Sequence, residues 1–411
     1  MKHAKQDKLR ERAARVIPGG MYGHMSVNWR MPDGYPQFFG QADGCRLWDV
    51  DGNEYIDYMC AYGPMILGYN HPEVLAVSDN QRREIDTATG PGPVMVELAE
   101  KMVSQISQAD WAMFAKNGND ATTICVTIAR AETERRVILV AQSAYHGAQP
   151  WCNYMSAGIL DSDHDYFRFY QYNDIESLEQ AVAEAGEDLA GIIVSALKHD
   201  AFVDQELPDP AFAKRARELC DQTGALLILD DVRAGFRLSL DTSWSKLGVT
   251  VDLAAWGKAI ANGEALAAVT GRDRSRAAAS SIFATGSFWF QAAPMAAAST
   301  TLDLLVEANA PDYLEHIGNI LRQGIYEQAQ KHGRPVRQTG PVQMPLILFE
   351  GDKRSVMGNA FCASLIQQGV YMHPWHNMFL SMAHTEADIE RTLKATDIAF
   401  HAVPESPADG G

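Results

Sequence analysis

The chain has 411 residues, 46% of them hydrophobic and 21% charged, which suits a globular protein of two or three domains. A formal net charge of −17 argues against binding to nucleic acid or to an anionic membrane surface. The six cysteines form no C-x-x-C pair, and the twelve histidines show no paired ligand spacing. We therefore expect no metal site. The charged N-terminus and scattered cysteines favour a cytoplasmic protein.

Residues 3–16 have the pattern of a short amphipathic helix, which Pro18-Gly19-Gly20 would end. Residues 45–58 then predict a β-hairpin, with Asp51-Gly52 as its turn. Beyond about residue 300 the chain is again helical and then mixed. This predicts a smaller α+β region at the C-terminus.

Between about residues 90 and 280, short runs rich in Val, Ile and Leu alternate with helical segments such as 175–186 and 209–222. Nearly continuous apolar strands separated by helices are typical of a largely parallel sheet covered on both faces. The class predicted is therefore α/β. The apolar runs are 136–141, 189–197, 225–231 and 251–257.

Polar side chains follow these strands where ligands bind in open α/β sheets, at the carboxyl ends. They occur in the segments 117–123 and 142–147, at Asp230 and at Lys258. Because parallel strands end at one edge, we expect the four segments to converge.

Each segment has a purely structural interpretation and a chemical one. Gly118 and Asn119 open a helix, either as part of a simple N-cap or as a site for phosphate. Lys258 is either a solvated charge or a partly desolvated amine that forms a Schiff base with an aldehyde. Asp230 is either a solvated strand end or the partner of a protonated ring nitrogen, and Tyr145 has a ring that could stack on a flat cofactor. Together the chemical interpretations describe pyridoxal 5′-phosphate (PLP).

These residues lie in motifs that resemble the class III, fold-type I aminotransferases, most closely glutamate-1-semialdehyde aminomutase and its relatives. The similarity runs nearly end to end. It rests on V-I-P-G-G (16–20), Y-G-P-M-I-L-G-Y-N-H-P (62–72), A-Y-H-G (144–147), D-D-V-R-A-G-F-R (230–237) and W-G-K-A-I-A-N-G (256–263).

The resemblance implies a fold-type I PLP-transferase. A large domain with a mostly parallel seven-stranded sheet would span residues 56–300. The smaller α+β domain would combine a segment at 1–55 with residues 301–404, before a disordered tail at 405–411. A homodimer with a shared active site is also implied.

The resemblance further implies the roles of individual residues. Lys258 would carry PLP as a Schiff base and move a proton, and Asp230 would pair with the pyridinium nitrogen. The other implied cofactor contacts are Gly118 and Asn119 at the phosphate, Tyr145 and Val232 on the ring faces, and His146. The reaction would be an amino transfer through pyridoxamine phosphate, from an amino donor to a carbonyl acceptor. An aminomutase, a lyase and a non-catalytic PLP-fold protein remain alternatives, and the donor and acceptor stay open.

The chain departs from the family pattern in several segments. Counting back from Pro294 puts Trp289 where the family has a threonine that binds the partner's phosphate, whereas a shifted alignment offers Ser287 or Thr285. Ser195 replaces an acid after one strand. The candidate substrate contacts are Arg30, Tyr62, Glu264, Trp289 and Trp375. A surface role for Arg30 and Glu264 and core packing for the aromatic residues are the alternatives.

Overall fold

The computed structural model describes residues 4–26, 31–32, 34–153 and 157–405, which form two compact units. The sheet unit comprises Pro72–Asp200 and Gln205–Pro311. The terminal unit comprises Met1–His71, Ala201–Asp204 and Asp312–Gly411. The domain boundaries expected at residues 55 and 300 stay a prediction. The tail expected at 405–411 lies, apart from Glu405, outside the described residues.

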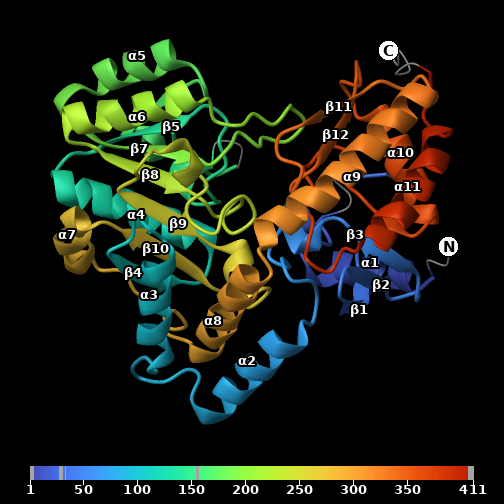
Figure 1. Cartoon of the computed structure of the whole chain (residues 1–411), viewed down its shortest axis with the longest axis horizontal. Helices are drawn as coiled ribbons and strands as arrows, with labels where there is room; N and C mark the ends of the chain where they lie inside the picture. The colour runs from blue at the N-terminus through green and yellow to red at the C-terminus, as the bar shows by residue number, and fades with distance from the viewer. Residues whose placement is uncertain (1–3, 27–30, 33, 154–156, 406–411) are drawn as a thin grey trace. The chain divides into compact units, whose positions relative to one another are not determined.

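The sheet unit is built on a seven-stranded sheet in the order β4-β10-β9-β8-β7-β5-β6 (Figure 1). Strand β10 runs antiparallel to both β4 and β9, whereas the pairs from β9 to β6 are parallel. The mostly parallel α/β sheet predicted from the sequence is thus confirmed. The strands are β4 (Trp111–Ala115), β5 (Val137–Ala141), β6 (Phe167–Tyr170), β7 (Leu189–Ser195), β8 (Leu226–Asp230), β9 (Leu253–Trp256) and β10 (Ala267–Gly271).

The central strands form because their sequences are apolar on both faces. Every residue of β5, β7, β8 and β9 is buried, which requires cover on each side of the sheet. Helix α4 contacts β4 and β7 to β10, whereas α5 and α6 lie together beside β5 to β8 (Figure 1). The helices of this unit are α2 (Pro72–Glu84), α3 (Val94–Gln105), α4 (Gly118–Thr133), α5 (Ile175–Ala185), α6 (Pro210–Thr223), α7 (Arg276–Ser281) and α8 (Ala292–Glu307).

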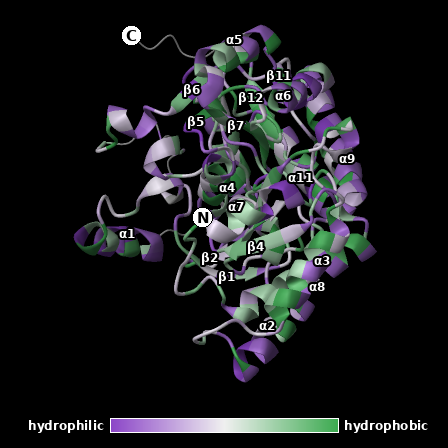
Figure 2. Ribbon diagram, turned by 90° about the vertical axis from the view of Figure 1, so that its left-hand side faces the viewer, coloured by the Kyte–Doolittle hydropathy of each residue, from purple (hydrophilic) through white to green (hydrophobic). Residues whose placement is uncertain are grey.

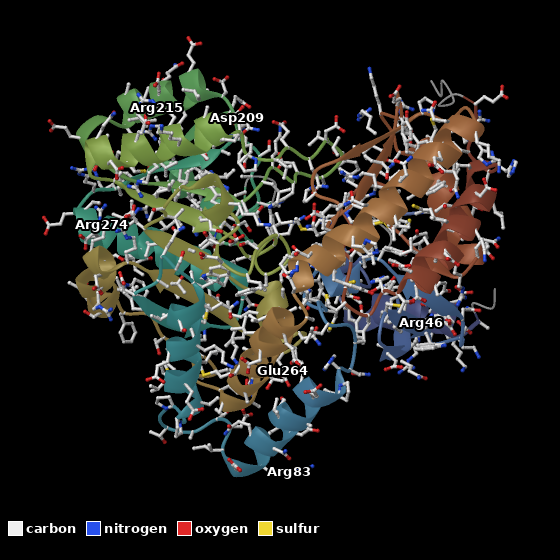
Figure 3. The ribbon with its side chains drawn as sticks, in the orientation of Figure 1. Arg46, Arg83, Asp209, Arg215, Glu264 and Arg274 are labelled. Carbon is white, nitrogen blue, oxygen red and sulfur yellow. The ribbon has the colours of Figure 1, made fainter. Side chains whose placement is uncertain are left out.

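Local signals set the ends of helix α6. The side chain of Asp209 accepts a hydrogen bond of 2.7 Å from the backbone N–H of Ala211, and Pro210 occupies the first helical turn. At the other end Gly224 adopts a left-handed conformation with φ of 75°. Figure 3 shows Asp209 at the start of α6 and Arg215 further along it. Arg215 Nε contacts Glu179 Oε1 of α5 at 2.6 Å.

The terminal unit contains a four-stranded sheet in the order β1-β2-β3-β13 and a two-stranded sheet of β11 and β12. Strands β2 and β3 pair antiparallel, so the predicted hairpin is confirmed. The elements are α1 (Ala4–Val16), β1 (Phe39–Asp43), β2 (Arg46–Asp49), β3 (Glu54–Asp57), α9 (Ala310–Lys331), β11 (Val336–Thr339), β12 (Leu346–Phe349), α10 (Val356–Gln367), β13 (Val370–Tyr371) and α11 (Glu386–Phe400); the first two residues of α9 fall in the sheet unit.

The hairpin turn also anchors helix α1. The carboxylate of Asp51 accepts hydrogen bonds from the backbone N–H groups of Lys5 and Gln6, at 2.9 and 3.0 Å. The Gln6 side chain is buried and bonds the backbone of Phe38 at 3.1 and 3.2 Å. The rest of α1 is largely hydrophilic in Figure 2. A mostly polar helix is therefore held by a few hydrogen bonds. No helix in the described part of the chain is both long and apolar enough to cross a membrane.

The antiparallel end of the seven-stranded sheet depends on a close contact at Gly271. A Cβ atom added there would lie 2.1 Å from the Trp111 ring of the neighbouring strand. We expect Gly271→Ala to lower the melting temperature by roughly 1–4 °C, because overpacking a filled core costs about 1–3 kcal/mol in a chain of this length. Differential scanning calorimetry measures this shift. Gly90→Ala is the matched control, since nothing lies within 4 Å of its added Cβ. Equal melting temperatures for both variants would contradict the expected packing.

Candidate active site

The carboxyl ends of β7, β8 and β9 bring the first of the predicted residues together. Ser195, the last residue of β7, pairs in register with Asp230, the last of β8. Asp230 in turn pairs with Ala255 of β9, three residues before Lys258. Parallel neighbours therefore place Asp230 and the start of the Lys258 segment at the same edge of the sheet.

Val232 holds the Asp230 and Lys258 segments against the start of α4. A Cβ atom added at Gly118 would lie 2.5 Å from Val232 Cγ1, and one added at Gly257 would lie 3.1 Å from the same atom. That added atom at Gly257 would also lie 3.5 Å from the Cα of Gly118. Only glycines allow three backbone segments to approach this closely. The convergence predicted for these segments is confirmed.

The fourth segment packs on the first turn of α4. Gly147 has a φ of 128°, and a Cβ atom added there would lie 2.2 Å from the Cβ of Asn119. The hydroxyl of Thr122 donates a hydrogen bond of 2.8 Å to the backbone carbonyl of His146. The sequence Tyr145-His146-Gly147 is thereby fixed beside the helix N-terminus.

The start of α4 fits both interpretations that the sequence left open, a helix N-cap and a phosphate site. Asp120 closes a helix cap, because its carboxylate accepts a 2.8 Å hydrogen bond from the backbone N–H of Asn117. Among the described residues, however, the backbone N–H groups of Gly118 and Asn119 have no hydrogen-bond acceptor. A capped helix start with two outward N–H groups suits a phosphate.

A buried pair forms the floor of this region. Asp230 Oδ2 lies 2.7 Å from His146 Nδ1, with both side chains less than a tenth exposed. Asp230 Oδ1 accepts a 3.1 Å hydrogen bond from the backbone N–H of Val232. His146 Nε2 is buried without a partner in the described part of the chain, and so is the hydroxyl of Ser195. The Asp230 carboxylate is thus fixed in orientation by two donors.

Lys258 is a half-buried amine in an unfavourable position for a charge. Burial and the guanidinium groups of Arg233 and Arg237 lower the pKa of Lys258 to about 7, against the opposing effect of Asp230. An appreciable share of this amine is therefore neutral, and able to attack an aldehyde, near neutral pH. The backbone of Lys258 is also left-handed, with a φ of 44°, a conformation that non-glycine residues adopt at a cost of about 1–3 kcal/mol.

Arg233 is a residue of this site that the sequence reasoning missed. It follows Val232 in the turn after β8, and burial lowers its pKa to about 10. The charges of Tyr145, Asp230 and Asp200 partly offset that burial, so Arg233 lies within electrostatic reach of all three. The signal was present in D-D-V-R, where an arginine follows three residues after a buried strand-end carboxylate.

The remaining candidate site residues of the sheet unit are Glu264, Thr285, Ser287 and Trp289. Glu264 Oε1 accepts hydrogen bonds from Ser78 Oγ at 2.6 Å and Arg82 Nη2 at 2.9 Å, which ties it to α2 (Figure 3). Thr285 and Ser287 are exposed between α7 and α8. Trp289 packs on Gly286, where an added Cβ atom would lie 2.3 Å from the indole nitrogen.

Three candidates lie outside the sheet unit. Trp375 is buried in the terminal unit, where its ring stacks on Phe202 at 4.3 Å between centroids. Tyr62 belongs to the same unit and donates a 2.8 Å hydrogen bond to the backbone carbonyl of His24. Arg30 lies outside the described residues. Substrate contacts by these residues stay a prediction.

Comparison with known proteins shows the family to which this chain belongs. The model of the class III aminotransferases matches residues 31–391. The chain belongs to this family.

Aminopentol aminotransferase of Sphingopyxis macrogoltabida is 51% identical to this class III aminotransferase over 399 residues, which cover 97% of this chain and 94% of the relative. The FumI protein of Sphingopyxis sp. MTA144, solved in its PLP internal aldimine form, is also 51% identical, with a TM-score of 0.96 and coverage of 97% and 96%. Glutamate-1-semialdehyde 2,1-aminomutase of Desulforamulus reducens is 31% identical, with coverage of 97% and 98%.

This class III aminotransferase is therefore a PLP-dependent enzyme of fold type I, as the sequence predicted. The residues present suit that cofactor. Gly118 and Asn119 offer a phosphate two backbone N–H groups that have no acceptor among the described residues, and the lowered pKa of Lys258 suits Schiff-base chemistry. The fixed Asp230 carboxylate is an acceptor for a protonated ring nitrogen.

The hydrogen bond from His146 to Asp230 yields a test of cofactor binding. We expect His146→Leu to weaken the Kd for PLP by roughly 10- to 100-fold, because a hydrogen bond to a charged group contributes about 1.5–3 kcal/mol. His146→Asn keeps a side-chain N–H near the position of Nδ1 and should restore most of the affinity. Titration of the apo-protein with PLP, followed by fluorescence, measures each Kd. Wild-type affinity in the leucine variant would refute a positioning role for His146.

The charge of Arg233 yields a test by pH. Removing a neighbouring positive charge favours the protonated amine, so Arg233→Met should raise the pKa of Lys258 above about 7. The apo-variant should then capture added PLP several-fold more slowly near about pH 7 and at a similar rate near about pH 9. Stopped-flow absorbance measures this rate. Arg215→Met, on the exposed side of α6, is the control and should follow the wild-type pH profile. Superimposable profiles for Arg233→Met would contradict the electrostatic account.

Proposed function

We propose that Lys258 carries PLP in this enzyme and moves the proton of the reaction. Gly118 and Asn119 hold the phosphate through their backbone N–H groups, and Asp230 accepts a hydrogen bond from the ring nitrogen. Val232 and Tyr145 pack on the two faces of the ring. The observation that carries this proposal is the convergence of three segments at Val232 and of the fourth on the first turn of α4, with a lysine of lowered pKa among them.

PLP, when bound, supplies an electron-withdrawing ring that acidifies the substrate carbon next to the amino group. The protein then has three tasks. The neutral Nζ of Lys258 takes the proton from that carbon, for which a pKa of about 7 is well matched to neutral pH. Asp230, held by His146 and the backbone of Val232, presents its carboxylate to the ring nitrogen. The positive charge of Arg233 disfavours protonation of the Lys258 amine.

The amino donor we propose is a primary amine on a hydroxylated hydrocarbon. Support comes from the 51% identity with aminopentol aminotransferase, a name that denotes an amine with several hydroxyl groups. The aminomutase relative is 31% identical over a similar length. An aminotransferase that accepts an amino alcohol and requires a separate carbonyl acceptor is therefore favoured over an aminomutase.

We further propose a cytoplasmic homodimer. The six cysteines, which all lie in the described part of the chain, form no disulfide, and this suits a reducing compartment. The segment between α7 and α8 exposes aromatic side chains, with Phe283 95% and Phe288 61% exposed. Exposed aromatic residues of this kind are typical of surfaces that a partner covers. In such a dimer Thr285 or Ser287, between these two rings, would reach the partner's phosphate site.

Absorption spectroscopy tests the role of Lys258 and the donor class together. The purified enzyme should lose its PLP band on addition of 2-aminooctadecane-1,3-diol without an acceptor and regain it with a 2-oxo acid. Lys258→Ala should lower the rate of this change by at least about 10²–10⁴-fold, as loss of a general base does. PLP should also no longer be reducible onto the variant chain with borohydride.

The controls separate the alternatives. Lys246→Ala removes an exposed lysine of the same unit and should behave like the wild type. Normal turnover by Lys258→Ala would overturn its assigned role. Conversion of glutamate-1-semialdehyde without any acceptor, together with no response to the amino alcohol, would indicate an aminomutase instead.

A further inference from the structure

Ser195 is a buried polar residue without a role in the proposed function. It is the last residue of β7 and is only 2% exposed. Its backbone carbonyl accepts a hydrogen bond of 3.2 Å from the hydroxyl of Tyr172, but its own hydroxyl has no partner among the described residues. Buried hydroxyl groups in native proteins nearly always have a partner, either in the protein or in a bound water. The Ser195 side chain therefore needs a neighbour that accepts or donates a hydrogen bond.

Ser195 and Asp230 point to the same face of the sheet. The two residues pair in register, and the side chains of paired residues in neighbouring strands lie on one face. Gly191 precedes Ser195 by four residues in β7 and so shares this face. A Cβ atom added at Gly191 would lie 3.4 Å from the Cβ of Ala129 in α4. The face that carries Ser195 and Asp230 is therefore the one that α4 covers.

A row of side chains crosses this face from β8 towards β6. It begins with Asp230 of β8, whose Oδ2 lies 2.7 Å from His146 Nδ1. The ring of His146 stacks on that of Trp151 at 6.3 Å between centroids, and Trp151 stacks on Phe167 of β6 at 5.3 Å. The row thus passes β7 and β5, which lie between β8 and β6 at about 4.8 Å per strand. As the first ring of the row, His146 lies over β7, the strand that ends in Ser195.

His146 has a ring nitrogen that complements the Ser195 hydroxyl. A carboxylate oxygen only accepts hydrogen bonds, so His146 Nδ1 carries the proton that it shares with Asp230. In the neutral ring Nε2 is then an acceptor, and it is buried without a donor among the described residues. The hydroxyl of Ser195 supplies a donor. A donor and an acceptor of this kind, both buried on one face, form a site for a bridging water.

We propose that Ser195 is a positioning residue of the active site, which acts on Asp230 through His146. Its hydroxyl donates a hydrogen bond to one buried water, and that water donates to His146 Nε2. The ring is thereby held with its Nδ1–H directed at Asp230, so the carboxylate keeps its orientation towards the ring nitrogen of PLP. A serine provides this contact without adding a charge beside Asp230, which an acid at position 195 would do. The inference rests on the proposed function, because it assumes that Asp230 faces that nitrogen.

Titration of the apo-protein with PLP, followed by fluorescence, measures the contribution of the Ser195 hydroxyl. Ser195→Ala should weaken the Kd by roughly 2- to 10-fold, as expected for the loss of one hydrogen bond. Ser195→Thr keeps a hydroxyl and should bind within about twofold of the wild type. Ser195→Cys keeps a weaker donor and serves if the extra methyl group of threonine prevents folding. Thr301→Val is the matched control and should leave the Kd unchanged, because it removes a hydroxyl of α8 that is also buried and unpartnered among the described residues.

A double-mutant cycle tests whether Ser195 acts through His146. Two groups that act on cofactor binding through one hydrogen-bond network have effects that do not add. Ser195→Ala should therefore change the Kd for PLP by less than about 1.5-fold in the His146→Leu background. The same factor in both backgrounds would overturn the proposed link between the two residues.

The ring nitrogen of PLP gives a readout that a loss of stability would not produce. PLP labelled with ¹⁵N in its ring can be bound to each variant, and the ¹⁵N chemical shift reports how far this nitrogen is protonated. A less well oriented carboxylate stabilises the protonated nitrogen less, so Ser195→Ala should shift the resonance towards that of neutral pyridine. Ser195→Thr and Thr301→Val should both retain the wild-type resonance. A wild-type resonance in Ser195→Ala would overturn the inference.

Asp230→Asn separates the inference from the proposed function. The expected result is a weaker Kd and a shifted ¹⁵N resonance in both Asp230→Asn and Ser195→Ala, with the smaller changes in Ser195→Ala. Both changes in Asp230→Asn and neither in Ser195→Ala would overturn the role of Ser195 and leave that of Asp230 intact. Wild-type values in Asp230→Asn would overturn the proposed role of Asp230 and the inference with it.

Discussion

The contact of Val232 with Gly118 and Gly257 is the constraint on which the active site depends. It joins the turn after β8, the start of α4 and the residue before Lys258, which are far apart in the sequence. Each position has a simple requirement, since a side chain at either glycine would separate the segments. This packing brings together the lysine, the carboxylate and the backbone N–H groups at the start of α4.

Electrostatics then gives these residues their chemistry. A half-buried lysine beside two arginines is unfavourable to the fold when charged, and that same penalty keeps the amine available near neutral pH. Asp230 is stabilised differently, by a histidine and a backbone N–H that fix both of its oxygens. The site therefore holds one group in a neutral form and another in a fixed orientation within the same few residues, as acid–base catalysis requires.

The two units use backbone strain in a similar way. Lys258 is left-handed at the end of β9, and Cys60, Ala61 and Tyr62 are left-handed after β3. Each such residue costs about 1–3 kcal/mol, which the surrounding structure has to offset. At Lys258 the strain directs a reactive amine, and at Ala61 it shapes the wall of an apolar pocket. Both observations favour function over simple packing at these positions.

The sequence by itself determined the α/β class, the central strands, the hairpin and the family, because these depend on apolar runs, turn residues and short motifs. It also singled out Lys258 and Asp230, whose neighbours in sequence are distinctive. The tertiary structure alone decided what surrounds them. The role of Arg233 and the contacts of Glu264 with Ser78 and Arg82 depend on which side chains meet across distant segments, and no local pattern encodes that. The same holds for an apolar pocket in the terminal unit, because its wall combines Met31 and Leu47 with the distant Tyr371.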